Sequence, residues 1–121
     1  MTDYQVILES AWYIRDVQSI DDAIGIAISE AGKRLNPTAK FVDVETGFLS
    51  CPYCSEELPA ALLIANTAFV GLRMEMKVFN AESPDHAGKI ARKTIGRAIQ
   101  NIPLDVIEVS EFGNRESNRE R

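Results

Sequence analysis

The sequence predicts an α+β domain with the ferredoxin-like order β-α-β-β-α-β, in which two helices pack on one face of an antiparallel sheet. Two segments have helical apolar spacing, each lies between segments of strand periodicity, and a cysteine-bearing β-ribbon is expected between the halves. The chain has 121 residues, 45% hydrophobic and 26% charged, which suits one soluble domain. We place this domain at residues 1–112 and expect a disordered polar tail at residues 113–121.

The first half begins with an alternating segment, residues 4–15, that is typical of a half-buried strand. Ser19 then precedes a stretch with apolar residues at helical spacing, which begins with two aspartates and closes with two basic residues. This pattern predicts a helix that Ser19 caps and that ends before Pro37.

Residues 41–46 are expected to form the strand that completes the first half, and the second half is expected to repeat the order strand-helix-strand. An apolar run at residues 60–65 follows the cysteines, and residues 68–81 have strand periodicity. Ser83, Pro84 and Asp85 form a helix start, and the helix is predicted to end near Asn101. A last strand is expected at residues 104–112.

An internal repeat relates the two helical segments. When Ser19 is aligned with Ser83, identical residues also coincide at five further positions, among them Ala27 with Ala91 and Gly32 with Gly96. Two copies of a strand-helix-strand unit give the split βαβ arrangement of a ferredoxin-like sheet.

The only two cysteines of the chain lie in the motif Cys51-Pro52-Tyr53-Cys54. Cysteines two residues apart on a tight turn can direct both thiolates at one zinc ion, which prefers four ligands in a tetrahedron. The sequence therefore predicts zinc as a cofactor bound by Cys51 and Cys54. The missing ligands would come from a second chain, as in a Cys₄ site shared by a dimer, or from Glu56, Glu57 or His86.

Two other readings of the cysteines remain open. The same four residues occur at the active site of glutaredoxins, so a thiol-disulfide oxidoreductase is an alternative. In this chain, however, Pro59 falls where the required helix would run. The third reading is that the cysteines are small semi-buried residues of a turn, without chemistry of their own.

The second helix carries a basic face on a chain whose formal net charge is -5. Its members are candidates for binding an anion, an RNA backbone or an acidic partner, and they are Lys89, Arg92, Lys93 and Arg97. A solvated helix face is the competing interpretation, because no aromatic residues are interleaved to stack on bases. No residue is nominated as catalytic, since the acids near both helix starts are explained by capping and by the helix dipole.

A pair of helices covers one face of a sheet, so the other face must be covered differently. We expect that face to carry apolar residues, namely Ile7, Ala11, Tyr13, Leu63, Phe69 and Phe79, which favours a homo-oligomer, with a dimer preferred. No basic, apolar leader is found at residues 1–10 and no apolar run is long enough for a membrane helix, so a cytoplasmic protein without membrane contact is expected.

The chain resembles a family of archaeal proteins of unknown function, the UPF0212 or DUF555 type. The matching stretches are residues 4–11, 19–27, 30–37, 51–54 and 75–81. The resemblance implies an archaeal cytoplasmic protein and a cysteine motif that is usually C-P-x-C-G, with Ser55 here in the glycine position. It implies no activity, and the sequence thus favours a zinc-stabilised oligomeric binding or regulatory module rather than an enzyme.

Overall fold

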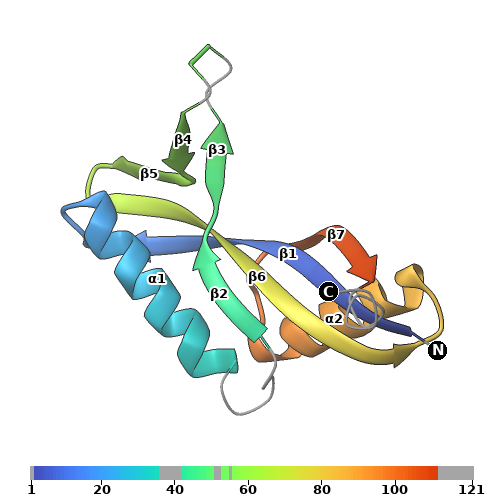
Figure 1. Cartoon of the computed structure of the whole chain (residues 1–121). Helices are drawn as coiled ribbons and strands as arrows, with labels where there is room; N and C mark the ends of the chain where they lie inside the picture. Colours follow the sequence, from blue (N-terminus) through green and yellow to red (C-terminus); the bar gives the residue numbers. More distant parts are fainter. Residues whose placement is uncertain (1, 36–41, 51–52, 55, 112–121) are drawn as a thin grey trace.

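A five-stranded antiparallel sheet and two helices form the body of the protein (Figure 1). The computed structural model describes residues 2–35, 42–50, 53–54 and 56–111. In chain order its elements are β1 (Thr2–Arg15), α1 (Ile20–Leu35), β2 (Val42–Thr46), β3 (Phe48–Ser50), β4 (Glu57–Pro59), β5 (Ala61–Ile64), β6 (Thr67–Ala81), α2 (Pro84–Ala98) and β7 (Leu104–Glu111). The predicted α+β class, with two helices and an antiparallel sheet, is confirmed.

The sheet is built around its two longest strands. β1 and β6 pair over nearly their whole length, from Thr2 opposite Ala81 to Arg15 opposite Thr67. The strand order is β2-β6-β1-β7, and β5 pairs with the first residues of β6, beyond the end of β2. All of these pairs are antiparallel, and the short strands β3 and β4 form a separate two-stranded sheet.

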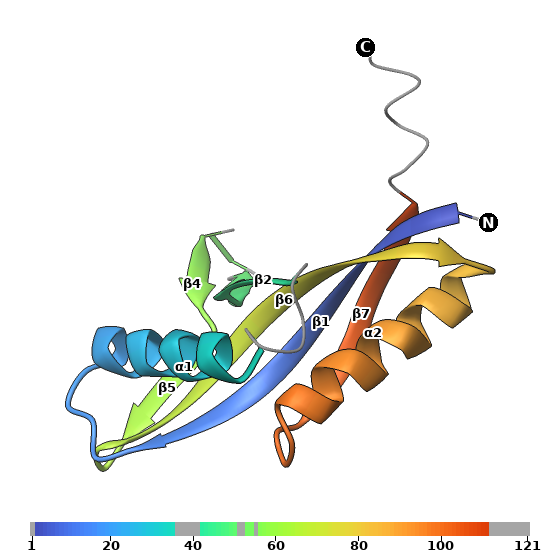
Figure 2. The same ribbon diagram turned by 90° about the horizontal axis from the view of Figure 1, so that it is seen from below.

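Both helices cover one face of this sheet. The alternating residues of β1 that were expected to be buried are buried, and their cross-strand partners on β6 are buried with them, for example Val70 opposite Trp12. Figure 2 shows α1 beside one end of the long strands and α2 beside the other. The buried residues near the N-termini of both helices are small, which allows the helices to pack closely on the sheet. The buried positions include Ala23, Ala27, Ala31 and Leu35 on α1, Ala87, Ala91 and Ile95 on α2, and Ile99 just after it.

The helix starts agree with the predicted caps. The Ser19 hydroxyl accepts a hydrogen bond from the Asp22 backbone N–H at 3.1 Å. At the second helix, the Ser83 hydroxyl accepts from the His86 backbone N–H, also at 3.1 Å. In each helix, therefore, a serine satisfies one of the free N–H groups of the first turn.

The structure differs from the predicted elements at the end of the second helix and at Leu63. The second helix ends at Ala98 rather than near Asn101, which lies beyond it in the left-handed region with φ of 69°. A turn at Ala65 and Asn66, with φ of 53° and 60°, joins β5 directly to β6 as a hairpin. The difference at Leu63 is described next.

The prediction that Leu63 lies on the uncovered face is wrong. Leu63 pairs with the buried Ala68 and packs against the core, whereas its neighbours Leu62 and Ile64 point to the other face. Because side chains alternate along a strand, an error of one residue in register exchanges the two faces.

Among the described residues, neither helix has the length and apolar character needed to cross a bilayer.

Candidate functional site

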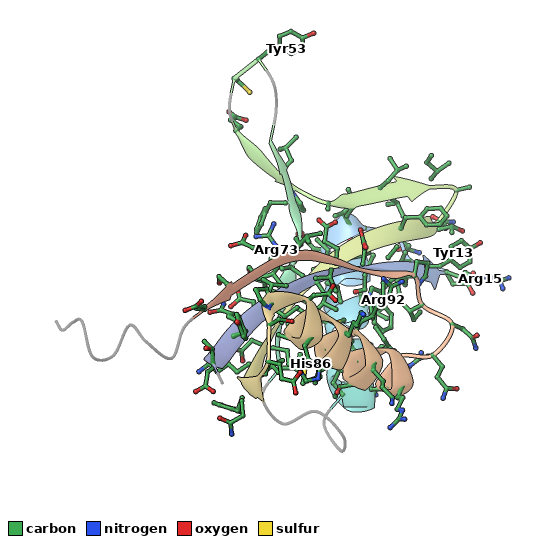
Figure 3. All side chains as sticks on the ribbon, turned by 90° about the vertical axis from the view of Figure 1, so that its right-hand side faces the viewer. Tyr13, Arg15, Tyr53, Arg73, His86 and Arg92 are labelled. Carbon is green, nitrogen blue, oxygen red and sulfur yellow. The ribbon has the colours of Figure 1, made fainter. Side chains whose placement is uncertain are left out.

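The β3–β4 ribbon is the most distinctive feature of the surface. Phe48 pairs with Pro59 and Ser50 with Glu57, so Tyr53 and Cys54, between the two strands, lie at its tip. The ribbon rises away from the sheet in Figure 1, and Figure 3 shows it on the side opposite α2. It therefore presents its tip well away from the hydrophobic core.

Three backbone hydrogen bonds fix the foot of the ribbon to the sheet. The N–H of Gly47 donates to the Gly71 carbonyl at 2.9 Å, and the N–H of Gly71 donates to the Ala60 carbonyl at 2.6 Å. The N–H of Ala60 closes the set by donating to the Gly47 carbonyl at 2.7 Å. A β-carbon added at Gly71 would lie 3.0 Å from that of Ala60, so this close crossing of backbones needs small residues.

The tip carries the candidate metal ligand Cys54. Cys54 is a free, exposed cysteine, and the neighbouring Tyr53 is 95% exposed. Cys51, the other predicted ligand, lies outside the described residues. Within the described ranges, no three ligating side chains of His, Cys, Asp or Glu come together. Cys54 is thus accessible to a ligand, and among the described residues it belongs to no group of three ligating side chains.

His86 does not lie near Cys54. Figure 3 places His86 on α2, across the sheet from Tyr53 at the ribbon tip. Its Nδ1 accepts a hydrogen bond from the Glu82 backbone N–H at 3.1 Å, so the imidazole forms part of the turn that starts α2. Of the two glutamates considered as ligands, Glu56 is exposed beside the tip.

The four basic residues predicted on the second helix are all exposed on α2. Lys89 forms an ion pair with Asp85 at 3.2 Å, and both side chains are largely exposed. Lys89 and Arg92 border a hollow between α2 and β7, whereas Arg97 lies with Arg34 at the C-terminal ends of the helices. Lys93 borders neither hollow, and it lies four residues from each of Lys89 and Arg97 along α2.

Two features of the site region were not predicted from the sequence. A hollow of about 390 Å³ lies between the foot of the ribbon and the start of β7, with Ala11 and Gly71 among its lining residues. Nearby on β6, the Nε of Arg73 is buried and has no hydrogen-bond partner among the described residues. The sequence signal for the hollow is that Ala11 and Gly71, in the middle of the long strands, are small residues.

Comparison with known proteins gives a family and no activity. A family described as "Protein of unknown function (DUF555)" matches residues 4–112. A UPF0212 protein of Methanospirillum hungatei is 68% identical over 112 residues, which cover 93% of this chain and all of the relative. Another, from Archaeoglobus fulgidus, is 51% identical over 112 residues, which cover 93% of this chain and 99% of that protein.

Solved structures are only distantly similar. The designed protein Foldit4 has a TM-score of 0.34 at 9% identity, with 89% of this chain and 96% of that one covered. A hydantoinase/carbamoylase family amidase from Burkholderia ambifaria has a TM-score of 0.32 at 9% identity, with 91% of this chain and 29% of that one covered. The sequence relatives, by contrast, match over nearly their full length, and the chain belongs to the DUF555 family, whose archaeal members are named UPF0212 proteins.

Proposed function

We propose that the protein is a non-catalytic binding or regulatory module that presents the cysteine pair Cys51 and Cys54 to a zinc ion at the tip of its ribbon. The observation that carries the proposal is the exposed Cys54 at the end of a ribbon whose foot is fixed by three hydrogen bonds. Cysteine thiolates are preferred zinc ligands, and two of them separated by two residues at a hairpin tip can bind the same ion.

The other ligands would come from a second molecule. His86 is across the sheet from the tip, and no ligating cluster is found among the described residues. Since structural zinc sites have four ligands, two ribbon tips would satisfy one ion as a Cys₄ site. Zinc would then act as a link between chains, and the homo-oligomer expected from the sequence would depend on it in part.

Metal analysis of purified protein tests the proposal. Protein prepared without oxygen or chelator should contain up to one zinc per two chains, measured by native mass spectrometry and elemental analysis. Cys51→Ser and Cys54→Ser should each remove the metal. Tyr53→Ser is the matched control, because it changes the tip between the cysteines and leaves both thiols. Metal-free wild-type protein that also fails to bind added zinc would refute the proposal.

The thiol-disulfide alternative is less well supported by the geometry. The thiol of a redox C-x-x-C motif is activated by the N-terminus of a helix that begins at the motif. After Cys54 the chain instead enters β4, which pairs with β3. Reversible loss of two hydrogens per chain, together with reduction of a test disulfide, would favour this alternative.

The RNA-binding alternative has the exposed basic residues of α2 in its favour. Within this surface, however, the Lys89 ammonium is paired with the Asp85 carboxylate at 3.2 Å, which offsets part of the positive charge. RNA binding predicts salt-dependent affinity for a labelled oligonucleotide that is lost when Lys89, Arg92 and Lys93 are changed to Glu. Binding that persists in this variant would exclude α2 as the RNA-binding surface.

The strand order supports a finer assignment of the fold. The sequence of pairs β2-β6-β1-β7, with the helices following β1 and β6, is the order expected of two interleaved β-α-β units. The two serine caps and the matching buried alanines support a repeat within the chain. We accordingly propose a ferredoxin-like domain of duplicated origin. The cytoplasmic location expected from the sequence remains a separate part of the proposal.

A further inference from the structure

The sheet face opposite the helices, called here the open face, exposes a group of large apolar side chains at one end. Tyr13 and Phe69 are cross-strand partners, and their ring centroids lie 5.1 Å apart. Phe69 is also the cross-strand partner of Leu62, and Ile64 follows Leu62 by two residues along β5, on the same face. These four side chains, the apolar patch, are exposed as follows: Tyr13 56%, Leu62 55%, Ile64 64% and Phe69 55%.

A hollow lies directly beside this patch. The next outward-facing pair along β1 and β6 is Ala11 and Gly71, which have almost no side chain. With Ala60 at the foot of the ribbon, they line both the 390 Å³ hollow and a second one of about 420 Å³ that reaches Leu62 and Phe69. The open face therefore has an exposed aromatic pair directly beside a hollow that small residues line.

We propose that the open face binds a second copy of this chain, with the aromatic pair of each protomer seated in the hollow of the other. The two-fold axis would lie in the interface, cross the strands, and pass between the Ala11–Gly71 pair and the Tyr13–Phe69 pair. Rotation about such an axis places each strand of the partner over the same strand of the first protomer, running in the opposite direction. Tyr13 then faces Ala11 of the partner, and Phe69 faces Gly71 of the partner, so large residues meet small ones.

The same axis brings opposite charges together. On the open face of β1 the pair Ala11 and Tyr13 is flanked by Glu9 on one side and by Arg15 on the other. Both side chains are exposed, and neither forms an ion pair within the described residues. Figure 3 shows Arg15 at the same end of the sheet as Tyr13. Reversal about the axis places Arg15 opposite Glu9 of the partner, and this pair occurs twice in the dimer.

The size of the apolar patch agrees with the centre of an interface. Two aromatic side chains that are slightly more than half exposed offer roughly 200 Å², and Leu62 with Ile64 brings the patch to roughly 400 Å². A stable interface buries about 800 Å² on each partner, so the patch would form the apolar centre and the charged residues the rim. The ribbon rises on this same side and would lie along the partner, adding to the contact area.

This dimer is independent of the proposed zinc site. The two-fold axis directs the ribbons of the two protomers in opposite directions, each past the other protomer. Their tips therefore do not meet within the dimer. Zinc bound between two tips would instead join two such dimers. Cys54→Ser should accordingly remove the metal and leave the dimer intact, which separates failure of one proposal from failure of the other.

A charge exchange tests the arrangement. Sedimentation equilibrium at micromolar concentration should show a dimer for the wild-type chain. Phe69→Lys should raise the dimer dissociation constant by at least about tenfold, because it places a charge in the apolar centre. Glu9→Arg and Arg15→Glu should each weaken the dimer by about threefold to tenfold, and the double variant should recover most of the loss.

Controls and contrary outcomes complete the test. Lys33→Glu, which changes the charge of an exposed residue of α1 on the opposite face, should leave the dissociation constant unchanged. Far-UV circular dichroism should show that each variant keeps the fold, as expected for exposed positions. A wild-type monomer, or a dimer that Phe69→Lys leaves intact, would overturn the proposal. If the double variant dimerises no more tightly than the single variant with the higher dissociation constant, the two-fold arrangement is wrong.

Discussion

Trp12 donates its indole N–H to the hydroxyl of Ser10 at 2.7 Å, and both residues point from β1 into the core beneath the helices. Ser10 is 3% exposed and occupies a position where the strand pattern would place an apolar residue. Because a buried indole N–H without a partner costs free energy, the serine satisfies a polar group that the core could not otherwise accept.

Ser10→Ala should lower the free energy of unfolding by about 1–3 kcal/mol, since it leaves the Trp12 N–H buried and unpaired. The measurement is urea unfolding followed by far-UV circular dichroism at one fixed protein concentration. In a Trp12→Phe background, which has no N–H donor, the same serine substitution should cost less by roughly 1 kcal/mol. Equal losses in both backgrounds would show that the hydrogen bond does not explain the burial of Ser10.

The helix caps provide a second prediction. Ser19→Ala and Ser83→Ala should each reduce stability by about 1 kcal/mol, because each removes the acceptor for an N–H of the first turn. Ser29→Ala, at an exposed position inside α1, is the control and should be neutral or slightly stabilising. Thermal unfolding of the three variants side by side distinguishes loss of a cap from loss of any serine hydroxyl.

Much of the fold could be predicted from the sequence because the signals were local. The alternation from Tyr4 to Ile14 and the capping residues Ser19 and Ser83 depend on near neighbours, and the structure agrees with each of them. The repeated spacing of small residues on the two helices likewise indicated one covered face. These features required no knowledge of distant contacts.

The remaining features depend on how separate segments cross. Leu63 was placed on the wrong face because the chain turns at Ala60 and passes Gly71, and no local pattern reports that crossing. The hollow beside Tyr13 has the same origin, since it forms only where Ala11 and Gly71 become neighbours. The zinc site at Cys51 and Cys54 stays a prediction, and Cys51 lies outside the described residues.

The close approach of the backbones at Gly47, Ala60 and Gly71 leads to a third prediction. A β-carbon at Gly47 would lie 3.2 Å from the carbonyl oxygen of Gly71, which is held by the hydrogen bond from the Gly47 N–H. Gly47→Ala should therefore destabilise the protein by about 1–3 kcal/mol, as expected when a tightly packed site is overfilled. Gly25→Ala is a matched control, because nothing lies within 4 Å of its added β-carbon and the position is inside α1. That substitution should stabilise the protein by about 0.5–1 kcal/mol, so the two glycines should respond with opposite sign.

The packing of α2 on the sheet gives the last prediction. Ile95 is fully buried in the shared core, at the position where α1 has the smaller Ala31. Ile95→Ala should cost about 2–5 kcal/mol, because it removes buried apolar area and leaves a cavity that the flanking strands cannot fill. Ile26→Ala on α1 makes the same chemical change at a side chain that is 47% exposed, and it should cost less than about 1 kcal/mol. Similar losses for the two variants in urea unfolding would mean that α2 packs on the sheet less tightly than its buried alanines and isoleucines indicate.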